Sequence, residues 1–214
     1  NCGGCGFPGC DGLAAAIAAG TAPVNGCPVG GAPVADKIAA IMGVESGSSE
    51  KKVAFVKCKG TCDKTNVKYN YYGITDCSMV TVAPGSGEKA CAYGCMGYGS
   101  CVKACQFDAI HVVDGVAVVD KEKCVACGKC VATCPKGLIE LVPYKAEHLV
   151  QCSSHDKGPA VKKVCTAGCI GCTLCTKQCE FDAIHMENNV AVIDYEKCTN
   201  CGKCAAKCPA KVIQ

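Results

Sequence analysis

The spacing of its cysteines constrains this chain more than any other feature. Of its 214 residues 25 are Cys, and the spacing C-x2-C-x2-C-x3-C occurs three times, at residues 124–134, 169–179 and 198–208. Aromatic residues make up only 5% of the chain and Trp is absent, so a core built on aromatic side chains is not expected. A chain this rich in cysteine, with 25 glycines, is expected to form small, turn-rich modules held together by disulfides or metals.

Metal clusters explain the spacing better than disulfides or zinc. In a C-x2-C-x2-C-x3-C run, three cysteines hold one [4Fe–4S] cluster and the fourth reaches the neighbouring cluster. Structural zinc sites use paired C-x2-C motifs instead. A disulfide scaffold needs an oxidising compartment and an even number of cysteines, whereas this chain has 25. We therefore expect iron–sulfur clusters, with structural zinc and disulfides as the competing hypotheses.

An internal repeat organises the second half of the chain. Eight cysteines between 91 and 134 recur 74 positions later. The sequence between them recurs as well, since Phe-Asp-Ala-Ile-His stands at 107–111 and at 181–185, and Val-Ala-Val at 116–118 and at 190–192. Each repeat therefore predicts one module with two clusters and a small hairpin between its two cysteine loops.

The two modules predict four clusters. In the first module Tyr98 stands where the second has Cys172, and we expect Cys91 to replace the missing ligand. A three-iron cluster at the Tyr98 position is the alternative. The expected ligand sets are Cys91, Cys95, Cys101 and Cys134; Cys105, Cys124, Cys127 and Cys130; Cys169, Cys172, Cys175 and Cys208; and Cys179, Cys198, Cys201 and Cys204.

A fifth cluster is expected near the N-terminus, where the cysteines follow a different pattern, C-x2-C-x4-C-x16-C. The loop is dense in glycine, which lets backbone amides turn inward and donate to cluster sulfurs. Helices are expected at 12–19 and at 34–42, ended by Gly20 and Gly43. The expected ligands are Cys2, Cys5, Cys10 and Cys27.

Five cysteines remain outside these sets: Cys58, Cys62, Cys77, Cys152 and Cys165. One hypothesis is a sixth cluster on Cys58, Cys62 and Cys77, with a fourth ligand from Cys91, Cys152 or Cys165. The other is that the remaining cysteines are free, buried thiols. The assignments compete, because a sixth cluster that takes Cys91 removes the replacement ligand of the first module.

The expected fold class is α+β, made of small irregular modules with metal cores. A four-cysteine [4Fe–4S] domain is followed by two tandem dicluster modules of bacterial ferredoxin type. The expected boundaries are 1–44 for the four-cysteine domain, 45–52 for a linker, 53–90 for an insert with Cys58, Cys62 and Cys77, 91–145 for the first module, 146–168 for a connecting segment and 169–214 for the second module.

Several functions are not expected from this sequence. All 22 basic residues are Lys, and without Arg the bidentate recognition of bases and phosphates is weak, so no nucleic-acid partner is expected. The Gly97-Tyr-Gly99 turn is not a dinucleotide motif, and no flavin or nucleotide site is expected. No apolar stretch approaches the ~20 residues of a membrane-spanning helix. Because the chain starts at Asn1, directly before Cys2, we interpret it as a piece of a longer protein.

The N-terminal motif Asn-Cys-Gly-Gly-Cys-Gly-Phe-Pro-Gly-Cys-Asp-Gly (1–12), followed by Cys27-Pro28 and ferredoxin modules, resembles the B subunit of the Rnf complex. That complex is a membrane-bound, ion-translocating ferredoxin:NAD+ oxidoreductase. The loops at 91–101 and 152–158 and the insert with Cys58 to Cys77 share the resemblance, which covers essentially the whole chain.

The resemblance implies an electron-transfer subunit of a translocase at the cytoplasmic face of the bacterial cell membrane. Such a subunit takes low-potential electrons from reduced ferredoxin and passes them through [4Fe–4S] clusters, at least five here, toward the other Rnf membrane and peripheral subunits. The electrons finally reduce NAD+, and the complex exports Na+ or H+. Family members carry an N-terminal transmembrane helix that this sequence lacks.

The chain itself would then be an electron carrier without a substrate site or catalytic residues of its own, because its cofactors supply the chemistry. The alternative is a polyferredoxin subunit of another anaerobic redox enzyme, such as a hydrogenase or dehydrogenase.

Overall fold

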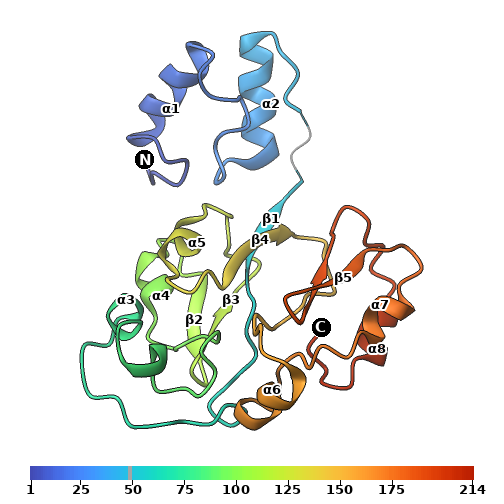
Figure 1. Ribbon diagram of the computed structural model, residues 1–214. Coiled ribbons are helices and arrows are strands. Elements are labelled where there is room, and N and C mark those ends of the chain that lie inside the picture. The colour runs from blue at the N-terminus through green and yellow to red at the C-terminus, as the bar shows by residue number, and fades with distance from the viewer. Residues whose placement is uncertain (48–49) are drawn as a thin grey trace.

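The protein is a series of short helices and two-stranded antiparallel sheets joined by turns, in a computed structural model that describes residues 1–47 and 50–214 (Figure 1). The N-terminal helices α1 (Gly9–Ala18) and α2 (Gly31–Met42) stand together at one end of the molecule. Both predicted helices are thus present, each with an earlier start than expected. Helix α2 ends where Gly43 adopts a φ of 65°, a left-handed conformation that glycine tolerates.

The region expected as a linker, 45–52, connects these helices to the rest of the chain. Its residues 48–49 lie outside the described residues. Strand β1 (Lys52–Val56) begins at the last residue of the expected linker.

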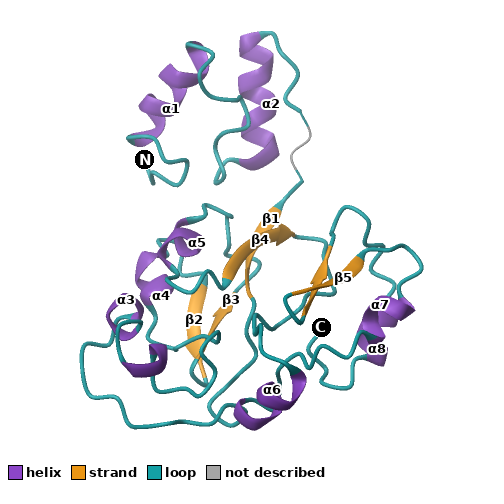
Figure 2. Cartoon of the chain, viewed as in Figure 1, coloured by secondary structure: helices purple, strands orange, loops and turns teal. Residues whose placement is uncertain are grey.

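The internal repeat is visible as two similar units of two helices and one hairpin (Figure 2). The expected hairpins are confirmed, and each turn has two successive residues with positive φ, as a tight hairpin turn requires. The first unit consists of α4 (Ser100–Ala104), β2 (Ile110–Val113), β3 (Val116–Val119) and α5 (Lys129–Thr133), and the second of α7 (Leu174–Gln178), β5 (Ile184–Glu187), β6 (Val190–Ile193) and α8 (Lys203–Lys207).

Strand β1 pairs with β4 (Ile139–Pro143), which follows the first unit. Val56 faces Ile139 in this sheet. In the second unit an isolated bridge joins Val150, which precedes the unit, to Ile213, which follows it. The first residues of the expected insert therefore belong structurally to the first module. The remaining elements are α3 (Cys77–Val80), a 3-10 turn at Pro84–Ser86 and α6 (Gly158–Val164).

The core is divided into small clusters in which cysteine thiols lie among aliphatic side chains. In the second unit Ile184, Ile193 and Ile213 are almost fully buried, and they pack in one cluster with Cys175 and Cys204. Each hairpin thus presents its apolar face to the cysteine loops. The hydrophobic core and the cysteine sites are therefore the same regions of the molecule.

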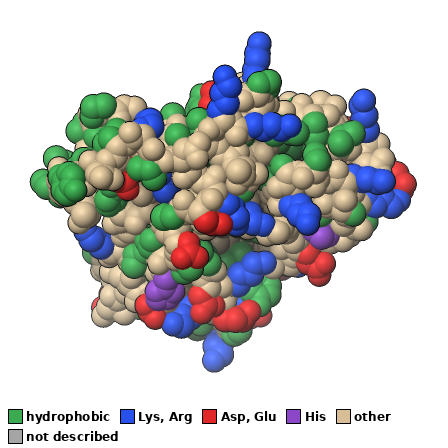
Figure 3. Space-filling model, turned by 90° about the horizontal axis from the view of Figure 1, so that it is seen from below, with side chains coloured by type: hydrophobic (Ala, Val, Ile, Leu, Met, Phe, Trp, Pro, Cys, Tyr) green, Lys and Arg blue, Asp and Glu red, His purple; other side chains and the backbone are tan. Residues whose placement is uncertain are grey.

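On the face of the molecule shown in Figure 3, lysine side chains are scattered among acidic ones. In the described part of the chain, no helix has both the length and the apolar character needed to cross a membrane.

Candidate metal centres

All 25 cysteines are free thiols. Within residues 1–47 and 50–214 no three Cys, His, Asp or Glu side chains converge closely enough to hold a single metal ion. Many of the thiols instead stand around small cavities. Three such cavities, each lined by at least four cysteines, are defined below.

The C-terminal cavity lies between β5, β6 and α8. Its thiols are those of one expected ligand set, Cys179, Cys198, Cys201 and Cys204. The Cys179 sulfur accepts a hydrogen bond from the backbone N–H of Ala183 at 3.3 Å. The spacing of this run therefore brings four thiols to a single cavity.

The cysteines that line the insert cavity differ from the expected set in one member. Cys95, Cys101 and Cys134 line it as predicted, but the fourth thiol is that of Cys77. Cys91, the expected fourth ligand, lines a different cavity. The insert therefore brings the Cys77 thiol to the cavity that Cys95, Cys101 and Cys134 line.

A hydrogen-bonded network holds Cys77 at this position. The Asp76 carboxylate accepts from Ser78 N–H at 2.9 Å, which caps helix α3. The buried Ser100 hydroxyl donates to the same carboxylate at 2.9 Å and accepts from Cys77 N–H at 2.8 Å. Since Ser100 directly precedes Cys101, the network ties the insert to the first cysteine loop.

The junction cavity lies between the two modules. Cys58, Cys91, Cys152 and Cys165 line it, together with Cys95.

Cys62, expected beside Cys58 and Cys77 in a sixth site, is exposed and lines none of the three cavities. Cys58 and Cys77 themselves line different cavities. The structure therefore separates the three cysteines that the sequence suggested as one group.

Several thiols of two further expected sets lie near one another. Burial and the neighbouring thiols of Cys124, Cys127 and Cys105 raise the pKa of Cys130 to about 11. In the second module, burial and the thiols of Cys169 and Cys208 raise the pKa of Cys175 to about 11. Cys172 is the exposed member of that set.

The N-terminal loop also folds around its thiols. The Asn1 side chain accepts from Cys10 N–H at 2.8 Å, and Gly30 N–H donates to the Cys27 sulfur at 3.3 Å. A Cβ added at Gly4 would lie 3.5 Å from the Cys2 sulfur and 3.4 Å from the Cβ of Cys127. The N-terminal loop thus approaches a cysteine loop of the first module.

The surroundings of the sulfurs fit [4Fe–4S] clusters. Backbone N–H groups donate to several cysteine sulfurs, which stabilises the negative charge of cluster-bound thiolates. Leu138 N–H donates to Cys134 at 3.4 Å, and the repeat-related Val212 N–H donates to Cys208 at 3.4 Å. Ala54 N–H, from strand β1, donates to Cys124 at 3.3 Å. Burial alone would keep the Cys130 and Cys175 thiols protonated, whereas a bound metal takes the place of the proton.

Sequence reasoning missed two residues beside the cavities. Lys89 is only 7% exposed, and its ammonium donates to Gly60 O at 3.1 Å and to Gly115 O at 2.6 Å at the edge of the junction cavity. His148 lines the C-terminal cavity, and its buried Nδ1 has no hydrogen-bond partner among the described residues. No spacing signal distinguishes Lys89 from the other lysines, or His148 from a structural histidine.

Comparison with family models agrees with the arrangement of cysteines. A model described as a putative Fe-S cluster matches residues 1–29, a 4Fe-4S binding domain matches residues 117–140, and a 4Fe-4S dicluster domain matches residues 168–213. The matches cover the N-terminal loop and parts of both modules. They support [4Fe–4S] clusters as the cofactors.

Curated relatives match the chain over its whole length. It is 52% identical over 214 residues to the B subunit of the Na(+)-translocating ferredoxin:NAD(+) oxidoreductase complex of Acetobacterium woodii. It is 47% identical to the B subunit of the ion-translocating oxidoreductase complex of Methanosarcina acetivorans, and 43% identical to that of the proton-translocating ferredoxin:NAD(+) oxidoreductase complex of Clostridium ljungdahlii. The chain spans 64%, 81% and 76% of the lengths of these three relatives. On its motifs, its cysteine loops and these matches, the chain belongs to the family of Rnf B subunits of ion-translocating oxidoreductase complexes.

Proposed function

We propose that this chain is the electron-transfer part of an Rnf-type ferredoxin:NAD+ oxidoreductase. It accepts low-potential electrons from reduced ferredoxin and passes them to the other subunits of a complex that exports Na+ or H+. The observation that carries the proposal is the match of the entire chain to B subunits of such complexes, combined with several separate groups of cysteines. The names of the Acetobacterium and Clostridium relatives refer to different ions, Na+ and H+, so the proposal covers the export of either ion.

In this proposal five sets of thiols hold five [4Fe–4S] clusters. Four sets are those expected from the spacing, and in the fifth Cys77 replaces Cys91 beside Cys95, Cys101 and Cys134. When bound, each cluster accepts and releases a single electron. The chain supplies the thiolates, the N–H donors that stabilise their charge, and aliphatic hairpin faces that keep water from the sites.

The fold supports a continuous route for electrons. In each dicluster module the last cysteine of one run belongs to the site of the other run, so the two sites share their loops. The approach of Gly4 to Cys127 supports an N-terminal site beside the site of Cys105, Cys124, Cys127 and Cys130. Electrons can therefore pass between the N-terminal domain and the first module.

We place the chain at the cytoplasmic face of the bacterial membrane, in contact with the membrane and peripheral subunits of the complex. Attachment by an N-terminal helix before the four-cysteine motif follows from the family resemblance. A polyferredoxin subunit of a hydrogenase or dehydrogenase remains the alternative function, and the full-length match to B subunits favours the Rnf assignment.

The test is to mix reduced ferredoxin with the oxidised, anaerobically purified full chain and follow the absorbance of its clusters. The proposal predicts rapid bleaching with uptake of several electrons per chain. If ferredoxin leaves the chain oxidised while dithionite reduces it, the chain carries electrons but does not accept them from ferredoxin. Co-purification with integral-membrane Rnf subunits separates the Rnf assignment from the polyferredoxin alternative.

A further inference from the structure

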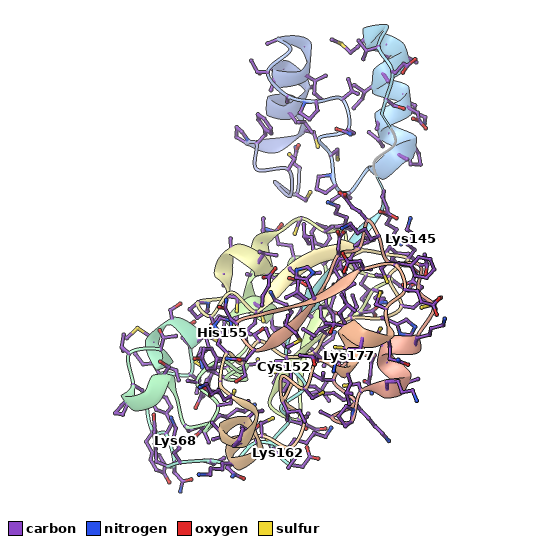
Figure 4. All side chains as sticks on the ribbon, turned by 45° about the vertical axis from the view of Figure 1, so that its right-hand side comes forward. Lys68, Lys145, Cys152, His155, Lys162 and Lys177 are labelled. Carbon is purple, nitrogen blue, oxygen red and sulfur yellow. The ribbon has the colours of Figure 1, made fainter. Side chains whose placement is uncertain are left out.

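The four thiols of the junction cavity come from two halves of the chain. Cys58 and Cys91 belong to the first module and its flanking strand, and Cys152 and Cys165 to the second module and the segment before it. Cys152 is buried and lies in the interior of the body formed by the two modules (Figure 4). The cavity is therefore placed where the modules meet.

The two halves are related by the internal repeat. Cys91 and Cys95 recur as Cys165 and Cys169, 74 positions later. The backbone N–H of Cys95 donates to the Cys58 sulfur at 3.3 Å, and the backbone N–H of Cys169 donates to the Cys152 sulfur at 3.3 Å. Cys152 thus has the same role toward the second module as Cys58 has toward the first.

The segments that carry Cys58 and Cys152 are bound in the same way. The N–H of Lys57 donates to Leu138 O at 2.8 Å, and the N–H of Gln151 donates to Val212 O at 2.8 Å. Leu138 and Val212 are themselves 74 positions apart. The repeat in backbone pairing therefore extends to the segments before Cys58 and Cys152. Two such segments and four thiols meet at the junction.

Close backbone approach brings the sulfurs to one place. A Cβ added at Gly94 would lie 3.4 Å from the Cys91 sulfur and 3.6 Å from the Cys58 sulfur. A Cβ added at Gly60 would lie 3.5 Å from the Cys165 sulfur and 3.7 Å from the Cys58 sulfur. Two glycines therefore line the space between thiols that are distant in the sequence.

The cysteine sulfurs of the junction cavity also accept hydrogen bonds. Besides the two N–H bonds already described, Ser154 N–H donates to the Cys152 sulfur at 3.4 Å and the Thr65 hydroxyl donates to the Cys165 sulfur at 3.6 Å. The Lys89 ammonium also lies at the cavity edge, where it adds a positive charge. These surroundings suit thiolates rather than inert thiols.

We propose that Cys58, Cys91, Cys152 and Cys165 hold a sixth [4Fe–4S] cluster that bridges the two dicluster modules. The proposal deepens the proposed function, because it completes the electron route. Cys91 and Cys95 lie on one loop, and so do Cys165 and Cys169, so the bridging site shares a loop with the nearest site of each module. A centre at the junction therefore connects the sites of the second module to those of the first.

The structure also removes the competition for Cys91. The insert supplies Cys77 to the site with Cys95, Cys101 and Cys134, which frees Cys91 for the junction. In the second module Cys172 occupies the position that Tyr98 has in the first. The set of Cys169, Cys175 and Cys208 is therefore complete with Cys172 and does not need Cys165. Every cysteine except Cys62 then belongs to a set of four, which gives six sets in all.

The test compares Cys152→Ala and Cys165→Ala with Cys62→Ala in the full chain, purified anaerobically. Iron and acid-labile sulfide per chain are measured, together with the spin intensity of the reduced protein by electron paramagnetic resonance. Because each cluster contains four irons, we expect about 24 irons in the wild type and in Cys62→Ala. In the other two variants we expect about 20 irons if the cluster is lost and about 23 if a three-iron cluster remains.

A wild-type content of about 20 irons that Cys152→Ala and Cys165→Ala leave unchanged would overturn the bridging cluster and leave the five-cluster proposal intact. A wild type without iron would instead contradict the proposed function itself. The wild-type count does not depend on how well any variant folds, so a misfolded variant leaves the test decisive.

Discussion

At the scale of single residues, the proposed ligand set of the first module contains Cys77 in place of Cys91, because Cys77 lines the cavity of Cys95, Cys101 and Cys134. We expect Cys77→Ala to lower the iron content by about one to four atoms per chain, because its site either becomes a three-iron cluster or is lost. Cys62→Ala, in the same insert but exposed, should leave the iron content unchanged. The two variants are compared by iron analysis and by the electron paramagnetic resonance signal of a three-iron cluster in the oxidised protein. Equal iron contents in the two variants would remove Cys77 from the ligand set.

Lys89 is the residue whose charge should matter most at the junction. Its buried ammonium lies beside the cavity, and a reduced cluster carries one more negative charge than an oxidised one. We expect Lys89→Gln to lower the reduction potential of the junction site by roughly tens of millivolts, since a favourable charge is removed. Lys162→Gln, on the exposed face of α6, is the matched control. A redox titration followed by electron paramagnetic resonance measures both, and equal potentials would show that Lys89 has only a structural role.

At the scale of elements, strand β4 joins the hydrophobic core to a cysteine site. Ile139 is 3% exposed and packs in one cluster with Cys101 and Cys130, whereas Leu141 on the same strand is 37% exposed. Ile139→Ala should lower the free energy of unfolding by about 2–5 kcal/mol, because it leaves a cavity, and Leu141→Ala should cost much less. Anaerobic urea unfolding of the holoprotein gives both midpoints. Similar midpoints for the two variants would mean that the cysteine sites alone determine stability.

The elements that could be predicted from the sequence are those set by local pattern. The hairpins follow from the repeated Ala-Ile-His and Val-Ala-Val segments, whose turns contain Asp-Gly and Asn-Asn. The pairing of β1 with β4 could not be predicted, because it joins residues 52–56 to residues 139–143. Periodicity within a strand does not identify a partner so far along the chain. The boundary expected at residue 53 therefore assigns to the insert a strand that belongs to the first module.

At the scale of the whole molecule, the regular spacing predicted the four thiols that line the C-terminal cavity, Cys179, Cys198, Cys201 and Cys204, because short loops determine which thiols meet. The irregular cysteines required the tertiary structure. Cys77 reaches Cys101 through the Asp76 and Ser100 side chains, and Cys58 meets Cys165 only where the two modules join. No spacing rule connects these positions. The repeat alone pointed to the relation between Cys91 and Cys165.

The central claim is that the cysteines hold iron–sulfur clusters that carry electrons through the chain. The most direct test measures iron, acid-labile sulfide and zinc in the anaerobically prepared full chain. The account predicts iron and sulfide in equal amounts, about 24 of each per chain and no fewer than about 20, with negligible zinc. Stoichiometric zinc with almost no iron would contradict it.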